Sequence, residues 1–362
     1  MDKIKSLEAC HGGRDARVAR RGVQGGQARK GDARRAKRAI RVAPQISRLD
    51  KDKSLFLSEM QTSGSWKASE KATSFPVTEP SSGKVLRYCS GFLKQDFSDA
   101  IEEADRGYRK SWSSTTAAER GRLLRKRYEL IIENVDDITI LISLENGNSS
   151  LDIQRACWGL WNCHTVELPC RYNNTKNCTC ICSGVCRGDY ASERDTFSAL
   201  ALAKLAIQAS IPTSIIHVVP TKAHQESLKL VKNPKVKKLS FTGSTRVSKI
   251  LTHLADRIIR KVSIQLGGNT LFIIFDNPDL DRAVEGTMAS KFRYAGQTCV
   301  VHNNNFSPKI RDISHILRVA RRLKCGMIGV NTGLITAYEL PFRGTKESSV
   351  GIEGSMYGLA EY

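Results

Sequence analysis

The strongest constraint on the fold is an alternation of short apolar runs and helical patterns that begins at Phe197. Between these runs, apolar residues recur every three or four positions, as on one face of a helix. A connecting helix returns the chain so that the next strand runs in the same direction, so this order predicts an α/β fold with parallel strands. We expect residues 190–300 to form most of one sheet. The apolar runs are "SIIHVVP", "VKKLSF", "VSIQL" and "LFIIF".

A hairpin is predicted upstream of this alternation. In residues 75–92 the turn residues "EPSSGK" separate two short apolar segments, which indicates two strands. Residues 49–74 are polar and predict a loop. A helix is expected from about Phe97 to Tyr108, because apolar side chains there fall on one face.

Two further helical segments carry clear local signals. Thr116 and Glu119 have the spacing of a capping box, in which each side chain bonds the other residue's backbone N–H. We expect the helix that they begin to be interrupted at 134–137 and to end at Gly147. The stretch "FSALALAKLAIQASIP" predicts an amphipathic helix that ends near Pro212.

The charge of the chain is concentrated at its N-terminus. The net charge is +21, and residues 1–48 contain 14 Lys and Arg against 4 Asp and Glu. No apolar core of a secretory signal is present there, and no run of eighteen apolar residues predicts a membrane-spanning helix. Three interpretations stay open: a disordered basic tail, a mitochondrial transit peptide, and a nucleic-acid-binding arm. We therefore expect a mitochondrial or, failing that, a cytoplasmic protein.

The cysteines are also unevenly distributed. Seven of the eleven lie between Cys157 and Cys186. The last four, Cys178, Cys180, Cys182 and Cys186, have C-x-C-x-C-x3-C spacing. This spacing lacks the paired C-x2-C knuckles of zinc sites, so we predict no metal. Residues 151–189 show neither helical nor strand periodicity, and we interpret them as a segment foreign to the fold of their flanks.

Two turns and one cysteine carry the candidate chemistry. In "SFTGST", Gly243 permits a tight turn and Ser244 can cap the following helix, whose N-terminal amides attract phosphate. In "SIQLGG", the glycine pair that begins at Gly267 permits close approach of a ligand to the backbone. Cys299, in "YAGQTCVVH", comes 34 residues after Gln265. By themselves these patterns also fit a capped turn and a structural cysteine.

The motif "ASKFRYAGQTC" and the preceding "KLSFTGST" and "SIQLGG" elements resemble the core of the aldehyde dehydrogenase family, in particular its succinate-semialdehyde branch. "FPVTEPSSGKV" and "IGVNTGLITAYELPF" agree. The resemblance implies an α/β fold with a Rossmann-like NAD-binding domain and a truncated α/β catalytic domain. The segments expected are a basic tail or transit peptide (1–60), the two parts of the NAD-binding domain (61–150 and 190–268), the anomalous Cys-rich segment (151–189), the truncated catalytic domain (269–335) and a C-terminal remnant (336–362).

In this family a cysteine thiolate attacks an aldehyde, NAD(P) accepts a hydride, and a glutamate activates the water that hydrolyses the thioester. By resemblance the nucleophile is Cys299, and the position of the base is occupied by Gln265. Arg293 and Thr336 fall at positions that bind the substrate carboxylate, which implies succinate semialdehyde, an intermediate of GABA catabolism. Positions assigned to the cofactor are Glu193, which favours NAD over NADP, and Gly243, Ser244, Ser248 and Gly267. Relatives are homo-oligomers.

The chain also departs from the family pattern. A glutamine at 265 cannot accept a proton from water at neutral pH, and loss of a general base costs about 10²–10⁴-fold in rate. The asparagine that stabilises the oxyanion is not identifiable in 151–189. The late element "PFRGTKESSVGIEG" has Ser349 where a glycine is usual, and little sequence separates Cys299 from Asn331.

These departures leave three hypotheses about function. The first is NAD-dependent oxidation of a small-molecule aldehyde. The second is a catalytically inactive or mis-assembled fragment of such an enzyme, with residues 1–60 and 151–189 poorly packed and apolar faces exposed. The third is a basic nucleic-acid-binding protein that acts through residues 1–48.

Overall fold

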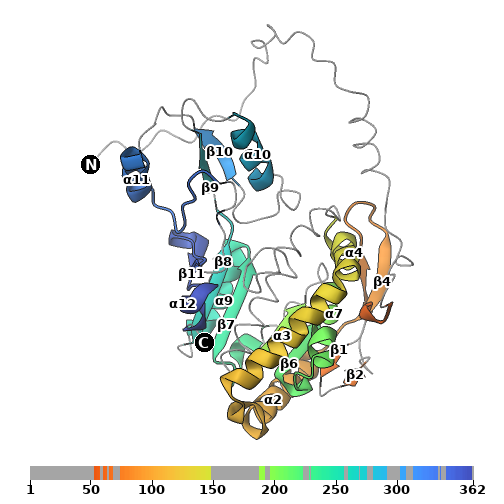
Figure 1. Cartoon of the computed structure of the whole chain (residues 1–362). Coiled ribbons are helices and arrows are strands. Elements are labelled where there is room, and N and C mark those ends of the chain that lie inside the picture. Colours follow the sequence, from red (N-terminus) through yellow and green to blue (C-terminus); the bar gives the residue numbers. More distant parts are fainter. Residues whose placement is uncertain are drawn as a thin grey trace. The chain divides into compact units, whose positions relative to one another are not determined.

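The computed structural model separates the chain into two compact units, Met1–Val42 and Ala43–Tyr362. All of the residues that it describes lie in the second unit (Figure 1). They are residues 53–57, 60–62, 65–67, 74–147, 187–191, 196–222, 228, 230–256, 260–268, 270–274, 280–291, 302–306, 313–332, 335 and 340–360.

The predicted hairpin is confirmed. Strands β3 (Ser74–Thr78) and β4 (Val85–Ser90) pair antiparallel. In the turn between them, Gly83 has a φ of +67° and its N–H donates to the carbonyl of Glu79 over 2.8 Å. Helix α2 (Lys94–Lys110) follows, and it includes the helix expected from Phe97 to Tyr108.

The local signals of the next two helices are also confirmed. In the capping box of α3 (Ala117–Glu133), the Glu119 N–H donates to Thr116 Oγ1 over 3.2 Å, and the Thr116 N–H donates to Glu119 Oε2 over 2.7 Å. Asn134 separates α3 from α4 (Val135–Asn146), so the predicted interruption over 134–137 is confirmed at Asn134 alone, and 135–137 already belong to α4. Gly147 ends α4 with a φ of +71°, a left-handed conformation that glycine adopts at little cost.

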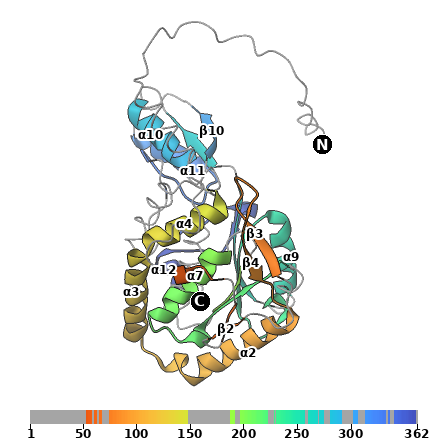
Figure 2. The same cartoon turned by 90° about the vertical axis from the view of Figure 1, so that its right-hand side faces the viewer.

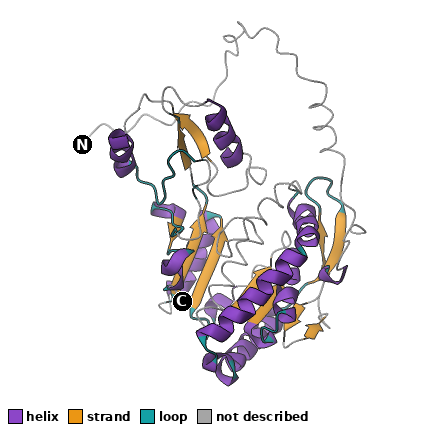
Figure 3. Ribbon diagram, viewed as in Figure 1, coloured by secondary structure: helices purple, strands orange, loops and turns teal. Residues whose placement is uncertain are grey.

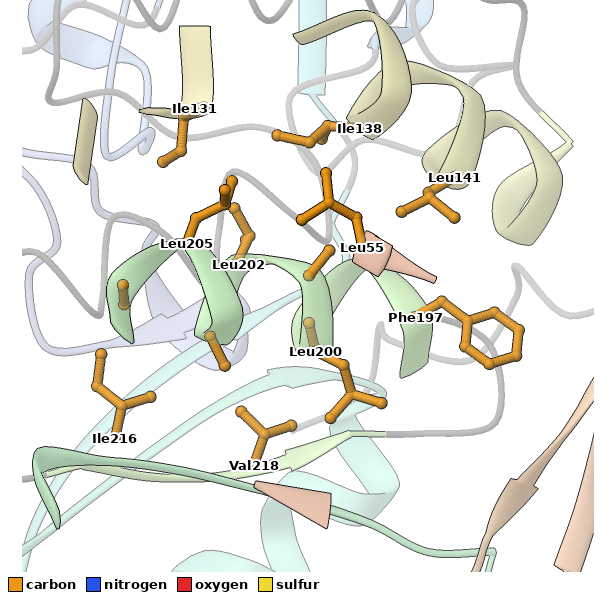
Figure 4. Close-up of a cluster of buried hydrophobic side chains, with 14 of the residues drawn as sticks. Leu55, Ile131, Ile138, Leu141, Phe197, Leu200, Leu202, Leu205, Ile216 and Val218 are labelled. Carbon is orange, nitrogen blue, oxygen red and sulfur yellow. The ribbon is translucent and has the colours of Figure 1, made fainter. Parts of the chain in front are cut away.

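Helix α7 (Thr196–Gln208) forms the centre of the main core, and here the predicted amphipathic pattern is wrong. Almost every side chain from Thr196 to Ala206 is buried, so the helix has no polar face turned to solvent. Helices α3 and α4 both contact α7 (Figure 2). In Figure 4, Leu202 and Leu205 point toward Ile131 and Ile138, while Ile216 and Val218 lie on the opposite side of α7.

A four-stranded sheet contacts α7 through β6 (Ile216–Pro220). Its order is β2-β1-β6-β5, with β5 (Arg187–Ala191) parallel to β6. Strands β1 (Met60–Thr62) and β2 (Ser65–Lys67) pair antiparallel with each other, and β1 pairs antiparallel with β6. The loop predicted over 49–74 is therefore wrong at these two strands. They have no apolar alternation that would predict a strand, and they form because β1 pairs with the distant strand β6.

The end of the expected basic tail belongs to the core. The 3-10 helix η2 (Lys53–Leu55) places Leu55 and its neighbour Phe56 among the buried residues of the main cluster, with the Phe56 ring 4.5 Å from that of Phe197. Poor packing of residues 1–60 is thus wrong for this stretch. Residues 1–52 and 148–186 lie outside the described residues.

The second part of the chain repeats one arrangement, a strand, a helix and a parallel strand (Figure 3). Strands β7 (Lys238–Gly243) and β8 (Lys261–Leu266) are joined by α9 (Thr245–Asp256), and β8 also pairs antiparallel with the short β11 (Ser349–Val350). Strands β9 (Thr270–Ile273) and β10 (His302–Phe306) are parallel and have α10 (Leu280–Lys291) between them in sequence.

The remaining elements are α11 (Ile313–Arg322), the 3-10 helices η3 (Trp112–Ser114), η5 (Thr213–Ile215) and η7 (Lys346–Ser348), and α12 (Ser355–Leu359). The alternation of strands and helices is therefore confirmed, with parallel pairing in each repeat. The expected single sheet over 190–300 is not observed among the described strands, which fall into separate sheets. Apolar side chains are exposed on α10 and α11, as expected: Val284, Met288, Ile313 and Leu317.

Candidate functional site

The carboxyl end of β7 and the start of α9 form the first part of the candidate site. Ser244 caps α9: the Val247 N–H donates to Ser244 Oγ over 3.4 Å, and the Ser248 N–H donates to the Ser244 carbonyl over 3.1 Å. A Cβ atom at Gly243 would lie 2.6 Å from Cζ of Phe241, so a larger residue there would have to displace the Phe241 ring. Gly243 and Ser244 are both exposed, which leaves the turn open to a ligand.

The carboxyl end of β8 lies beside this turn. In the parallel register, Thr242 is opposite Gln265 and Gly243 is opposite Leu266. The structure therefore brings together the predicted phosphate-binding turn and the predicted position of the base, which are over twenty residues apart in sequence (Figure 1). Gly267 follows directly and is exposed, with no atom within 4 Å of where a Cβ would stand.

Gln265 itself is buried, with 4% of its surface exposed. Its Nε2 has no hydrogen-bond partner. On its other side it pairs with Ser349 of β11, so the two side chains lie on the same face of the sheet. The side-chain amide of Gln265 can donate hydrogen bonds through its NH₂ group and accept them through its oxygen, but it cannot act as a general base.

The loop before β11 forms an ion pair with α9 and a hydrogen bond within itself. Lys249 Nζ donates to Glu347 Oε1 over 2.8 Å, and this ion pair holds the pKa of Glu347 below its usual value. Both side chains are largely exposed, so the pair contributes little to stability. Within the loop, Ser348 Oγ donates to the Thr345 carbonyl over 2.7 Å. These bonds hold the segment that ends in Ser349 close to α9 and β8.

The β7–α9 turn fits the phosphates of a dinucleotide cofactor. The first turn of a helix carries N–H groups without intrahelical partners, and the helix dipole places partial positive charge there. At α9 these groups follow an exposed glycine–serine pair at the carboxyl end of a parallel strand, which is where α/β sheets bind nucleotides. Ser248, also predicted to contact the cofactor, is buried in the first turn of α9.

Four predicted site residues lie outside the described residues: Cys299, Arg293, Glu193 and Thr336. Their roles stay predictions. In the described ranges, no group of three or more His, Cys, Asp and Glu side chains is arranged to hold a metal ion. None of the described helices is long and apolar enough to cross a membrane.

One feature of the site was missed by sequence reasoning. The sequence shows a serine at 349 where a glycine is usual, but it does not show that Ser349 lies opposite Gln265, because no local pattern indicates an antiparallel pairing between distant segments. One sequence signal could have suggested the pairing: Gln265 and Ser349 both differ from the residues that the family resemblance predicts at these positions.

Comparison with known proteins decides the ancestry of this arrangement. The sequence profile described as "Aldehyde dehydrogenase family" matches residues 66–157, 178–307 and 310–362. The chain belongs to the aldehyde dehydrogenase family. Both turns of the candidate site, Gln265 and Cys299 fall inside the matched ranges. The match is interrupted within the Cys-rich segment and again just after residue 307.

Among its relatives is the succinate-semialdehyde dehydrogenase [NADP(+)] of Escherichia coli (strain K12), with 26% identity over 469 positions that cover 86% of this chain and 97% of the relative. The glutarate-semialdehyde dehydrogenase of Pseudomonas putida is 26% identical over 468 positions, with the same coverage. The crystal structure of succinate-semialdehyde dehydrogenase from Burkholderia pseudomallei superposes with a TM-score of 0.77 at 25% identity, covering 86% of this chain and 97% of that one. The aldehyde dehydrogenase fold, mixed α/β, is therefore confirmed.

The same alignments show that this chain is internally shorter than its relatives. The alignment with the Escherichia coli enzyme runs over 469 positions, whereas the whole chain has 362 residues. Parts of the relative therefore have no counterpart here, although the alignment reaches over almost all of its length.

Proposed function

We propose that this chain captures and oxidises an aldehyde that carries a carboxylate group, with Cys299 as nucleophile and NAD as hydride acceptor. The observation that supports the proposal best is the family match, which includes the "GQTC" motif of Cys299 and the Gly243 turn. Two relatives are named for succinate and glutarate semialdehydes, both of which are aldehydes with a distal carboxylate.

In the proposed reaction the Cys299 thiolate adds to the aldehyde carbon, and the carbonyl oxygen becomes an alkoxide bound to that carbon. As the carbonyl re-forms, a hydride leaves the same carbon and a thioester to Cys299 remains. When bound, the nicotinamide supplies the acceptor for that hydride. Hydrolysis then adds water to the thioester carbon, releases the carboxylic acid, and returns the proton to the Cys299 sulfur.

The last step is the slow one in this chain. Gln265 replaces the glutamate that takes a proton from the attacking water in the family, and an amide does not accept that proton. We therefore propose that the thioester forms faster than it is hydrolysed. The chain would act as an acyl-capturing protein with weak turnover rather than as a fast dehydrogenase.

Recognition of the carboxylate is assigned to Arg293 and Thr336. A guanidinium binds a carboxylate through two parallel N–H donors, and a hydroxyl adds a third. Glu193 is assigned to the adenosine ribose, which favours NAD. The named cofactor of the Escherichia coli relative is NADP(+), so both cofactors belong in the test.

The test is a rapid-mixing experiment with the full chain, succinate semialdehyde, and either NAD or NADP. The proposal predicts a burst of reduced cofactor close to one equivalent per chain, followed by a slow steady state. Gln265→Glu should raise the steady-state rate by about 10²–10⁴-fold, because it restores a base. Cys299→Ala should abolish both phases.

A second candidate is a catalytically inactive remnant of such an enzyme. The shortening of the chain relative to its relatives favours it, as does the missing base at 265. Absence of any burst with both cofactors, in a preparation with a cooperative thermal transition, would favour the remnant over the enzyme. In either case we propose that the Arg-rich residues 1–48 direct the chain to mitochondria, which a fluorescent fusion of that segment would test.

A further inference from the structure

Three polar side chains whose hydrogen-bonding atoms are buried share one face of strands β8 and β11. Ser263 and Gln265 are two residues apart on β8, so both point to the same side of the sheet. Ser349 on β11 is directly opposite Gln265, which puts their Cβ atoms about 4.5–5.5 Å apart. We call Ser263, Gln265 and Ser349 the β8–β11 polar face.

None of the three groups is satisfied within the protein. Ser263 Oγ, Gln265 Nε2 and Ser349 Oγ are all buried atoms without a hydrogen-bond partner. Ser263 and Gln265 are 1% and 4% exposed. Because buried polar groups in folded proteins are nearly always hydrogen-bonded, three orphaned donors on one face are unusual.

The two serines nearest to this face in the sheet and loop are hydrogen-bonded within the protein. Ser240 Oγ, on the adjacent strand β7, donates to the carbonyl of Ser263 over 3.4 Å. Ser348, next to Ser349, bonds within its own loop. Among the described residues of β8 and β11, the three unpartnered groups therefore lie on one face of the sheet.

Two of the three residues are substitutions relative to the family pattern. Gln265 stands in place of a glutamate and Ser349 in place of a glycine, and the structure pairs these two positions. A carboxylate was thus replaced by a neutral amide with an N–H donor, and a hydroxymethyl group was added beside it. Both changes add hydrogen-bond donors, and the first also removes a negative charge.

We infer that the β8–β11 polar face binds a carbonyl oxygen, with the Gln265 amide as its directed donor and the serine hydroxyls beside it. Three neutral donors match an oxygen acceptor, and a buried site without its own charge favours an uncharged carbonyl over a carboxylate. Identification of the ligand as the carbonyl of an aldehyde or acyl group rests on the proposed function. In that setting Gln265 holds the reacting oxygen and does not activate water.

The test uses butyramide, a small carbonyl compound that does not react with thiols, and measures binding to the full chain by calorimetry and by thermal shift. Gln265→Leu removes the donor at similar volume and should weaken binding about 5- to 10-fold, which is the loss of one neutral hydrogen bond. Ser349→Gly should weaken it by a smaller factor. Val350→Ala, on the exposed opposite side of the same strand, is the matched control and should bind as the parent does.

A second readout separates a ligand site from a structural role. If the donors serve a ligand, Gln265→Leu should raise the melting temperature of the ligand-free chain, because it removes an unsatisfied buried amide. The same variant should lose the upward shift that butyramide causes in the parent.

Unchanged butyramide affinity in Gln265→Leu, or a lower melting temperature of that variant without ligand, would overturn the inference and leave only a water-filled structural contact. If butyramide binding depends on Gln265 but the chain gives no cofactor-reduction burst, the β8–β11 polar face is supported as a carbonyl-binding site and the proposed reaction is wrong. If the chain gives a burst but butyramide binding does not depend on Gln265, the proposed reaction is supported and the carbonyl-binding role of the β8–β11 polar face is wrong.

Discussion

The carboxylate of Glu145, at the end of α4, caps the N-terminus of α7 through the amide of Phe197. The Phe197 N–H donates to Glu145 Oε1 over 2.5 Å, and the Ser198 N–H donates to Oε2 over 2.9 Å. The Ser198 hydroxyl donates to the same oxygen. Glu145 is 2% exposed, so the negative charge is held inside the core by the amides and the positive end of the helix dipole.

We expect Glu145→Ala to lower the free energy of unfolding by about 2 kcal/mol, because it leaves the first amides of a buried helix without acceptors. Urea unfolding followed by circular dichroism measures this change. Glu129→Ala, on the exposed surface of α3, is the control and should change stability by less than about 0.5 kcal/mol. Equal effects of the two substitutions would show that the cap contributes nothing.

His217, in the middle of β6, should make the free energy of unfolding decrease in mild acid. Its ring is fully buried and its Nε2 lies 3.0 Å from the Ser214 carbonyl. Burial lowers the pKa of His217 below the ordinary value of 6.5, although the Ser214 carbonyl and the charge of Glu103 oppose that shift. Below pH 6.5 the unfolded chain therefore binds a proton that the folded chain does not, and stability decreases as the pH falls through this value.

The measurement is the urea midpoint of the parent and of His217→Gln from neutral pH down to about pH 5, because ordinary carboxylates are still mostly charged at that pH. His217→Gln should flatten the decrease that begins near pH 6.5. His253→Gln, which alters an exposed residue of α9, should leave the decrease intact. If the parent and His217→Gln lose stability in parallel, the imidazole is not the group responsible.

Cys89 and Cys325 should differ sharply in reactivity. Burial in β4, together with the charge of Glu145, raises the pKa of Cys89 to about 12, so its thiol stays protonated and shielded. Cys325 is exposed. Because the thiolate is the reactive form, native chain treated with iodoacetamide should be modified at Cys325 and spared at Cys89, as peptide mass mapping would detect. Labelling of both at equal rates in native buffer would mean that the β3–β4 hairpin opens readily.

Arg293 should decide whether the substrate needs a carboxylate. Arg293→Met removes a bidentate partner, so we expect about a 10- to 100-fold loss of affinity for succinate semialdehyde and little change for butyraldehyde, which has no carboxylate. The concentration dependence of the reduction burst measures both. Lys291→Met removes a nearby cation at the end of α10 and serves as control. Equal losses for the two aldehydes would assign Arg293 a role in folding instead.

Much of the secondary structure could be predicted because its causes are local. The capping box of Thr116 and Glu119 joins residues three apart, and Gly147 ends a helix by its own backbone conformation. The alternation of strands and helices after Phe197 has the same local character, and it led to the correct fold class. The resemblance around Cys299 identified the family from a short motif, and the family match confirms it.

Only the tertiary structure decided the features that depend on distant segments. The polar residues Gln61 and Thr62 form a strand because β6 offers an edge to pair with, and α7 lacks a polar face because helices and a sheet cover it from opposite sides. Gln265 and Ser349 are two separate departures in the sequence. The two residues stand opposite each other because β11 returns antiparallel to β8, and no pattern of neighbouring residues encodes that pairing.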